Sequence, residues 1–308
     1  DGVGGEPNYN VISGGLNGGP HKDTDIYNNT ISGCSDDGIE AEGPQVNVRV
    51  WDNIIKNCLI GIGLAPQIVG PSYTFRNILH DNTNNAFKLG ELSRGKAYVY
   101  HNTIYSRAGN GIAASGGSGV DKEYGNFVFH NNIADVPTRP IELGRPNNIY
   151  NYDNLFGVSA FVSWCTNQVG TCTQVNYATL SDFQASGKEL NGVSIPTTSE
   201  FVSVANSDFR LKSGSLLLDK GAVIRGLNDP NSAWPYQGTA PDMGAFEFGG
   251  GASIKINADI AYTISETVTL TLVCPSASTV RYSNDGTFDT EPSETFASSK
   301  TWTLIVGD

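Results

Sequence analysis

Short segments that alternate apolar and polar residues recur about every 24 residues along this chain, and each contains an asparagine. A large apolar residue follows two positions after the asparagine. In the first five segments another apolar residue comes nine or ten positions after it, and alanine or leucine lies two positions further. These columns keep their register over five repeats, which indicates a repeated structural unit. The aligned asparagines are Asn29, Asn53, Asn77, Asn102, Asn131 and Asn154.

Each repeat is too short for a strand followed by a helix, but it has room for two or three brief strands separated by Gly and Asn. The pattern therefore predicts an all-β solenoid of short parallel strands, in which equivalent residues stack about 4.8 Å apart. An asparagine at a fixed corner can hydrogen-bond to its copies above and below. The predicted core columns are Ile31, Ile55, Leu79, Ile104, Ile133 and Phe156; Ile39, Ile62, Phe87, Ile112 and Ile141; and Ala41, Leu64, Leu89, Ala114 and Leu143.

Strand alternation also predicts which side chains leave the coil. The residues that lie three positions before each asparagine are expected to point inward: Ile26, Val50, Thr74, Val99, Val128 and Asn151. The residues two positions before the asparagine are expected to point outward: Tyr27, Trp51, Phe75, Tyr100, Phe129 and Tyr152. The residues four positions before it are also expected to point outward: Asp25, Arg49, Tyr73, Tyr98, Phe127 and Tyr150. So many exposed rings are typical of a ligand surface. The candidates for binding a glycan are Tyr27, Trp51, Phe75, Tyr98 and Tyr100. Alternatively, loops or the C-terminal section cover these rings, or the rings only form a ladder.

A second candidate site lies in "SDDGIEAEG", where four carboxylates fall within seven residues. Ile39 enters the core, so Glu40 faces outward at the head of a column that continues through Gly63, Lys88, Ala113 and Glu142. Acids beside cations could serve as general acid and base, or could hold Ca²⁺ while Arg or Lys removes a proton. The catalytic candidates are Asp36, Asp37, Glu40, Lys88 and Arg76. The alternative is a solvated turn of the coil.

Composition narrows the function classes. The net charge is −12, so the chain lacks the basic surface that nucleic-acid binding requires, and no apolar run is long enough to span a membrane.

Cys165 and Cys172 bracket a short loop that a disulfide would close. Cys34 and Cys58 are expected on adjacent turns, as a disulfide or as free thiols. Cysteine usage suggests an oxidising compartment. The chain begins without Met, as expected of a processed form or a fragment.

The repeat fades after Phe156. Three acids in the following section, Asp219, Asp242 and Glu247, are expected to hold turns. The glycines at 249–251 are interpreted as a linker between a solenoid domain at 1–248 and a small β-sandwich at 252–308, whose segments alternate like strands. This last part resembles the immunoglobulin-like modules of bacterial surface and secreted proteins. Its 57 residues leave the final strands missing, and Cys274 is expected to be a buried core thiol.

The solenoid resembles right-handed parallel β-helix repeat proteins of the carbohydrate-active type over roughly residues 20–250. The resemblance implies a right-handed, single-stranded solenoid. "SDDGIEA" is similar to the paired-aspartate motif of polygalacturonase-type glycoside hydrolases, which implies acid and water-activating roles for Asp36 and Asp37. That family has Gly-His-Gly one turn later, whereas this chain has Gly61-Ile62-Gly63.

Two functions follow. The first is a secreted or cell-surface protein that binds or degrades polysaccharide, by hydrolysis or by β-elimination. The second is a non-catalytic structural, adhesive or filament-forming surface protein, which assembles through its C-terminal module. His101 and His130 are expected to stack on successive turns, as a ladder of like residues or, alternatively, as a metal pair, and no zinc-like spacing is present. Ca²⁺ is the one cofactor that the acids could accommodate.

Overall fold

The computed structural model describes residues 3–4, 22–90, 93–114, 125–249, 253–256, 267–273 and 299–303. The chain divides into two compact units, Asp1–Phe248 and Gly249–Asp308. Within the described residues, no helix is long and apolar enough to cross a membrane.

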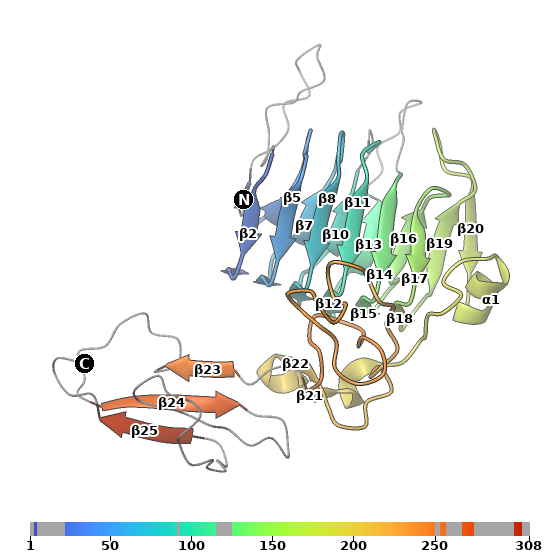
Figure 1. Cartoon of the computed structure of the whole chain (residues 1–308). Coiled ribbons are helices and arrows are strands. Elements are labelled where there is room, and N and C mark those ends of the chain that lie inside the picture. Colours follow the sequence, from blue (N-terminus) through green and yellow to red (C-terminus); the bar gives the residue numbers. More distant parts are fainter. Residues whose placement is uncertain are drawn as a thin grey trace. The chain divides into compact units, whose positions relative to one another are not determined.

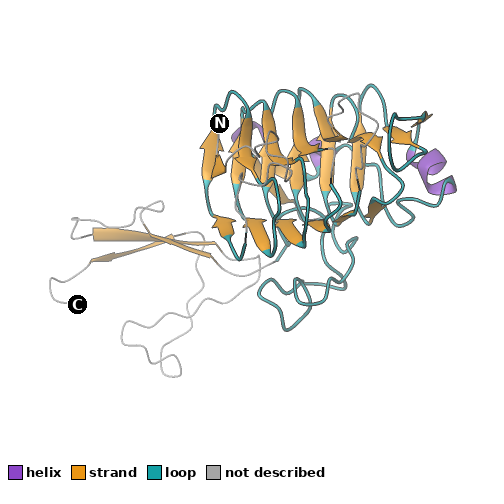
Figure 2. Ribbon diagram, turned by 90° about the horizontal axis from the view of Figure 1, so that it is seen from above, coloured by secondary structure: helices purple, strands orange, loops and turns teal. Residues whose placement is uncertain are grey.

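Unit 1 is a parallel β-helix built from three sheets, each of which receives one strand per turn (Figures 1 and 2). The predicted solenoid of about 24 residues per turn is confirmed. Sheet 1 contains β1 (Val3–Gly4), β4 (Asp37–Glu40), β7 (Ile60–Leu64), β10 (Asn85–Leu89), β13 (Asn110–Ala114), β16 (Ile141–Gly144), β19 (Val162–Cys165) and β20 (Gln174–Tyr177). Sheet 2 contains β2 (Asp25–Tyr27), β5 (Val48–Trp51), β8 (Ser72–Phe75), β11 (Ala97–Tyr100), β14 (Phe127–His130) and β17 (Ile149–Asn151). Sheet 3 contains β3 (Thr30–Ser32), β6 (Ile54–Lys56), β9 (Ile78–His80), β12 (Thr103–Tyr105), β15 (Ile133–Val136) and β18 (Asn154–Gly157).

An amide ladder runs through the corner between sheets 2 and 3. In each turn the asparagine side-chain amide donates a hydrogen bond to the side-chain oxygen of the ladder residue in the next turn. That oxygen accepts hydrogen bonds only from the ladder residue in the turn before. The bonds between the side chains are 2.8–3.0 Å long. The same amides also donate to backbone carbonyls of sheet 2. These bonds satisfy polar groups that would otherwise be buried without partners, so the ladder stabilises the stacking of turns. Its members are Asn29, Asn53, Asn77, Asn102, Asn132 and Asp153.

The predicted register is therefore wrong by one residue in the last two turns. The fifth member of the ladder is Asn132, not Asn131, and the sixth is Asp153, not Asn154. Two adjacent asparagines in "HNNI" made the alignment ambiguous. Asn131 instead adopts a left-handed conformation with φ 63° and leaves the ladder. The core column in sheet 3 accordingly ends with Ala134 and Leu155 in place of Ile133 and Phe156.

The core columns predicted for sheet 1 are found in the structure, except in its later turns. Ile39, Ile62, Phe87, Ile112 and Ile141 pair in register and are buried. Leu143 is the exception. A register shift between Ile141 and Gly144 places Gly144 opposite Trp164, and Leu143 takes a left-handed conformation with φ 54°. Trp164 lies where a side chain at position 144 would point, so the tryptophan fills the core at this turn.

The segment after the coil first closes one end of it. β20 adds to β19 in antiparallel sense, and α1 (Leu180–Ala185) buries Phe183 against the core. Thr179 and Asp182 form a reciprocal capping box that begins this helix. η1 (Thr197–Ser199), β21 (Phe201–Ser203), η2 (Val204–Asn206) and β22 (Asp208–Leu211) follow.

The rest of this section packs against sheet 3 around a second apolar cluster that includes Ile78, Tyr105 and Ile133. The three acids predicted to hold turns do so. Asp219 accepts from two backbone N–H groups at 2.7 and 3.0 Å, Asp242 from two at 2.6 and 2.8 Å, and Glu247 from two at 2.8 and 3.0 Å.

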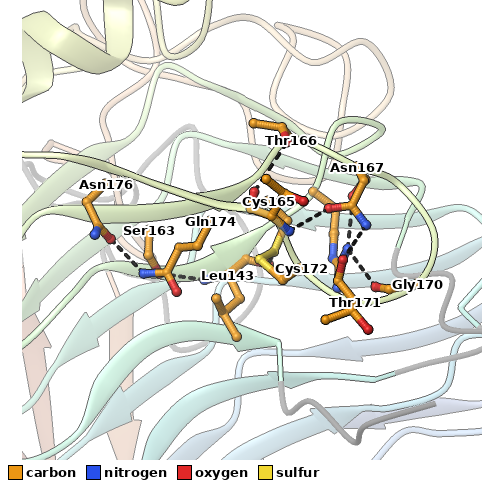
Figure 3. The surroundings of a disulfide bond; sticks show 12 residues. Leu143, Ser163, Cys165, Thr166, Asn167, Gly170, Thr171, Cys172, Gln174 and Asn176 are labelled. Atoms are coloured by element: carbon orange, nitrogen blue, oxygen red, sulfur yellow. Dashed lines mark hydrogen bonds between the residues drawn. A yellow bond between two sulfur atoms is a disulfide. The ribbon is translucent and has the colours of Figure 1, made fainter. Parts of the chain in front are cut away.

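Both cysteine pairs are joined. Cys34 and Cys58 form a disulfide between adjacent turns, with Cα atoms 4.3 Å apart, which resolves the two alternatives. The predicted Cys165–Cys172 disulfide closes its loop (Figure 3). Inside that loop the Asn167 amide donates to the carbonyl oxygens of Val169 and Thr171.

Unit 2 contains one antiparallel sheet, with β23 (Ser253–Ile256) and β25 (Ser299–Thr303) on either side of β24 (Thr267–Val273). The three strands coincide with segments that alternate in the sequence. The immunoglobulin-like sandwich, and self-assembly through it, stay predictions. Cys274 and "STVRYS" (278–283), another segment that alternates in the sequence, lie outside the described residues.

Candidate functional site

The pairing along the predicted outward column of sheet 1 is confirmed strand by strand, but Glu40, Gly63 and Ala113 are buried and not exposed. Glu40 pairs with Gly63, Gly63 with Lys88, Lys88 with Ala113 and Ala113 with Glu142. Lys88 lies two turns from the acidic segment, and its flexible side chain spans that distance. Gly63, on the intervening turn, leaves the space open, because a side chain there would collide with the carboxylates of Asp37 and Glu42.

These residues form what we call the acid–lysine cluster, Asp37, Glu42 and Lys88. Lys88 Nζ lies 2.5 Å from Asp37 Oδ2 and 3.0 Å from Glu42 Oε1. Both carboxylates are buried, whereas the lysine side chain is 19% exposed. Asp37 and Lys88, two of the catalytic candidates from the sequence, are therefore in contact. Glu42 was not among those candidates. The signal for Glu42 was its spacing of two from Glu40, which places both residues on the outward side of the segment.

Burial shifts the acid–base properties of the cluster. Loss of hydration raises the pKa of Glu42 to about 7, against the lowering effect of Lys88, and it also raises the pKa of Asp37. Lys88 is partly desolvated too, which alone would lower its pKa, but the two carboxylates outweigh this and raise it. Lys88 is therefore held as an ammonium ion, and Glu42 is the group that exchanges a proton near neutral pH.

The spacing of the two acids is set by their shared partner. Asp37 Oδ2 and Glu42 Oε1 can be separated by no more than the sum of their distances to Lys88 Nζ. The two oxygens lie closer than that limit, because both would collide with one side-chain carbon at position 63, and their spacing is shorter than the about 5–5.5 Å at which carboxyl pairs of retaining glycosidases operate. A water molecule between acid and base, as in inverting enzymes, would need a wider gap.

The remaining catalytic candidates are placed differently. Glu40 is buried at the head of the column, and Asp36 is half-buried just before β4. Arg76 is not brought to the cluster. It follows β8 in sheet 2, where it pairs with Asp52 at 3.3 Å and lies 5.9 Å from the ring of Trp234.

Calcium does not fit the cluster as it stands. Ca²⁺ needs six to eight oxygen ligands, and the described residues contain no group of three or more His, Cys, Asp or Glu arranged to hold a metal. The Lys88 ammonium occupies the place between the two carboxylates that a cation would take. We therefore derive no chemical step through calcium.

The aromatic face of sheet 2 follows the corrected register. Its outward column nearest the ladder is Tyr27, Trp51, Phe75, Tyr100, His130 and Asn151, so Phe129 and Tyr152 were wrongly assigned to it. Phe129 and Tyr150 point into the core in place of Val128 and Asn151. The next outward column is Asp25, Arg49, Tyr73, Tyr98, Val128 and Ile149, without Phe127 and Tyr150.

The C-terminal section covers part of this face. Trp234 packs edge-on against Trp51 and Phe75, at 5.3 Å between ring centroids in each case, and Phe75 is only 7% exposed. The predicted alternative of a covered stripe thus holds for Phe75. Tyr27 is 47% exposed.

The two central histidines do not stack on each other. His130 pairs in register with Tyr100, and His101 lies beside Asn131. Burial lowers the pKa of His101 to about 3, so the ring is neutral. Its Nδ1 donates to the Gly244 carbonyl at 3.2 Å, and its Nε2 accepts from the amides of Asn131 and Asn228 at 2.9 and 2.7 Å. His101 therefore ties the C-terminal section to the coil.

The sequence matches no protein-family model and no curated protein. Among solved structures, the crystal structure of pectate lyase Pel9A is similar, with a TM-score of 0.44 and 19% identity over 73% of this chain and 51% of that one. The chain spans about half the length of that structure.

Proposed function

We propose that this protein is an extracellular enzyme that cleaves polysaccharide by acid–base chemistry at the acid–lysine cluster. The observation that carries the proposal is the Glu42 carboxyl, whose pKa is raised to about 7 while it contacts the Lys88 ammonium on the outward face of a parallel sheet. Strongly shifted carboxyl groups that lie beside a specific charge partner are concentrated at catalytic sites. The two disulfides are consistent with secretion.

Each member of the cluster has a distinct part. Glu42, protonated below about pH 7, gives its proton to the oxygen of the leaving sugar as the glycosidic bond breaks, and water adds its hydroxyl group to the other fragment while its proton returns to the Glu42 carboxylate. Asp37 is the second carboxyl of the pair, and Lys88 balances the negative charge of both acids. The carboxyls are buried and Lys88 is the one member that is partly exposed, so the substrate meets the cluster at Lys88 and must displace its side chain.

Glu42→Gln is expected to lower the rate of cleavage at least about 100-fold, because it removes the proton donor without changing the size of the side chain. The matched control is Glu142→Gln, a half-buried acid of the same outward column, which should keep the wild-type rate. The measurement is release of reducing ends from a panel of neutral and acidic polysaccharides. Ultraviolet absorbance of unsaturated ends separates elimination from hydrolysis.

The wild-type rate should fall as the pH rises through about 7, because only protonated Glu42 can act as the acid. Equal rates for Glu42→Gln and the wild type, or no cleavage of any polymer in the panel, would overturn the proposal.

A further inference from the structure

The outward face of sheet 2 carries a set of half-exposed aromatic side chains that the acid–lysine cluster does not use. We call it the aromatic face and define it as Tyr27, Trp51, Tyr73, Tyr98, Tyr100 and Trp234. The first five lie on consecutive strands of sheet 2, and Trp234 approaches from the C-terminal section against Trp51. Contiguous exposed aromatic surface on a stable coil usually marks a binding site.

The rings are ordered by stacking between turns. Tyr27 and Trp51 are parallel to within 1° with centroids 4.3 Å apart, and Tyr73 and Tyr98 are within 15° at 5.4 Å. Stacking of this kind turns the ring faces along the coil and leaves ring edges outward. Tyrosine and tryptophan combine a large apolar ring with a polar group, which suits them to the mixed surface of a sugar. Because the rings already contact one another, a ligand loses little affinity to side-chain ordering.

The charges on this face are already neutralised. Asp25 accepts from both Nε and Nη2 of Arg49, at 2.6 Å each, and Trp51 Nε1 donates to the same carboxylate at 3.1 Å. Arg76 is engaged by Asp52 and by the ring of Trp234. An anionic polymer would have to break these pairs and approach a protein of net charge −12.

We infer that the aromatic face binds a neutral polysaccharide, at a surface separate from the acid–lysine cluster. A polymer chain laid across β2, β5, β8 and β11 would contact rings on four successive turns, so its affinity would come from repeated weak contacts. The inference does not depend on cleavage, because sheet 2 and sheet 1 are different faces of the coil.

The test is affinity electrophoresis of the full chain in gels that contain hydroxyethylcellulose, galactomannan, arabinoxylan or polygalacturonate. We expect at least one neutral polymer to retard the protein, with little change when salt is added. Trp51→Ala and Tyr98→Ala should each weaken that retardation about tenfold. The matched control is Tyr177→Ala, which removes a half-buried tyrosine from β20 of sheet 1 and should bind as the wild type does. Thermal unfolding of each variant confirms that it is folded.

The variant Glu42→Gln distinguishes this inference from the proposed function. We expect this variant to bind the neutral polysaccharide as the wild type does. Loss of retardation in Glu42→Gln but not in Tyr98→Ala would locate the polysaccharide on sheet 1, which overturns the inference and leaves the proposed function standing. Stronger retardation by polygalacturonate than by every neutral polymer, or none by any polymer, also overturns it. Cleavage assays then decide the proposed function independently.

Discussion

Asn77→Ala is expected to lower the free energy of unfolding by about 3–5 kcal/mol, because Asn77 lies in the middle of the amide ladder and is fully buried. Its Oδ1 accepts from the backbone and side-chain nitrogens of Asn53 at 3.1 and 2.9 Å. Its Nδ2 donates to Val50, Phe75 and Asn102. Alanine leaves donors and acceptors on three turns without partners and without access to water, so the loss exceeds that of a single hydrogen bond.

Asn29→Ala is the matched control, because Asn29 is half-buried and occupies the first position described in the ladder. Its amide donates only to Tyr27 and Asn53, and Asn53 Oδ1 keeps the bond from the Asn29 backbone N–H. We expect a loss of about 1 kcal/mol. Urea denaturation followed by far-ultraviolet circular dichroism measures both variants. Equal losses would show that the ladder adds nothing beyond its individual hydrogen bonds.

The fold was largely predictable from the sequence because a solenoid repeats one local environment. Each turn needs an amide at the same corner and apolar residues at the same inward positions, so these requirements appear as columns. The prediction failed where the repeat length changed. The ladder steps 30 residues from Asn102 to Asn132 and then 21 to Asp153, and in "HNNI" either asparagine satisfied the pattern. Only the pairing of β11 with β14 distinguishes them.

The candidate site was predictable only in part, for a different reason. Register alone placed Lys88 above Glu40 and Gly63, but the two carboxylates that Lys88 contacts depend on how far its side chain reaches. The position of Trp234 could not be predicted either. It comes from a section without repeats, which reaches sheet 2 through contacts such as those of His101 with Gly244 and Asn228.

The destabilising effect of Lys88→Met is expected to depend strongly on pH. At pH 8 the variant should lose about 3–5 kcal/mol, because two buried carboxylates lie side by side without the ammonium that compensates them. Each can escape this penalty only by taking up a proton, so their folded-state pKa values must rise further above those of the unfolded chain. A carboxyl whose pKa is raised in the folded state contributes stability at low pH, and that contribution is lost as the pH rises through the folded value.

The loss in Lys88→Met should therefore be small at pH 5, where both carboxyls can be protonated in the folded state, and should grow steadily to pH 8. Urea denaturation at several pH values measures it. Lys220→Met is the matched control, because Lys220 is exposed, and we expect a change within about 0.5 kcal/mol at every pH. A loss in Lys88→Met that is the same at pH 5 and pH 8 would mean that Lys88 acts through packing of its aliphatic chain. Glu42 would then not depend on Lys88 for its charge, and the acid–base role proposed for the cluster would lose its electrostatic basis.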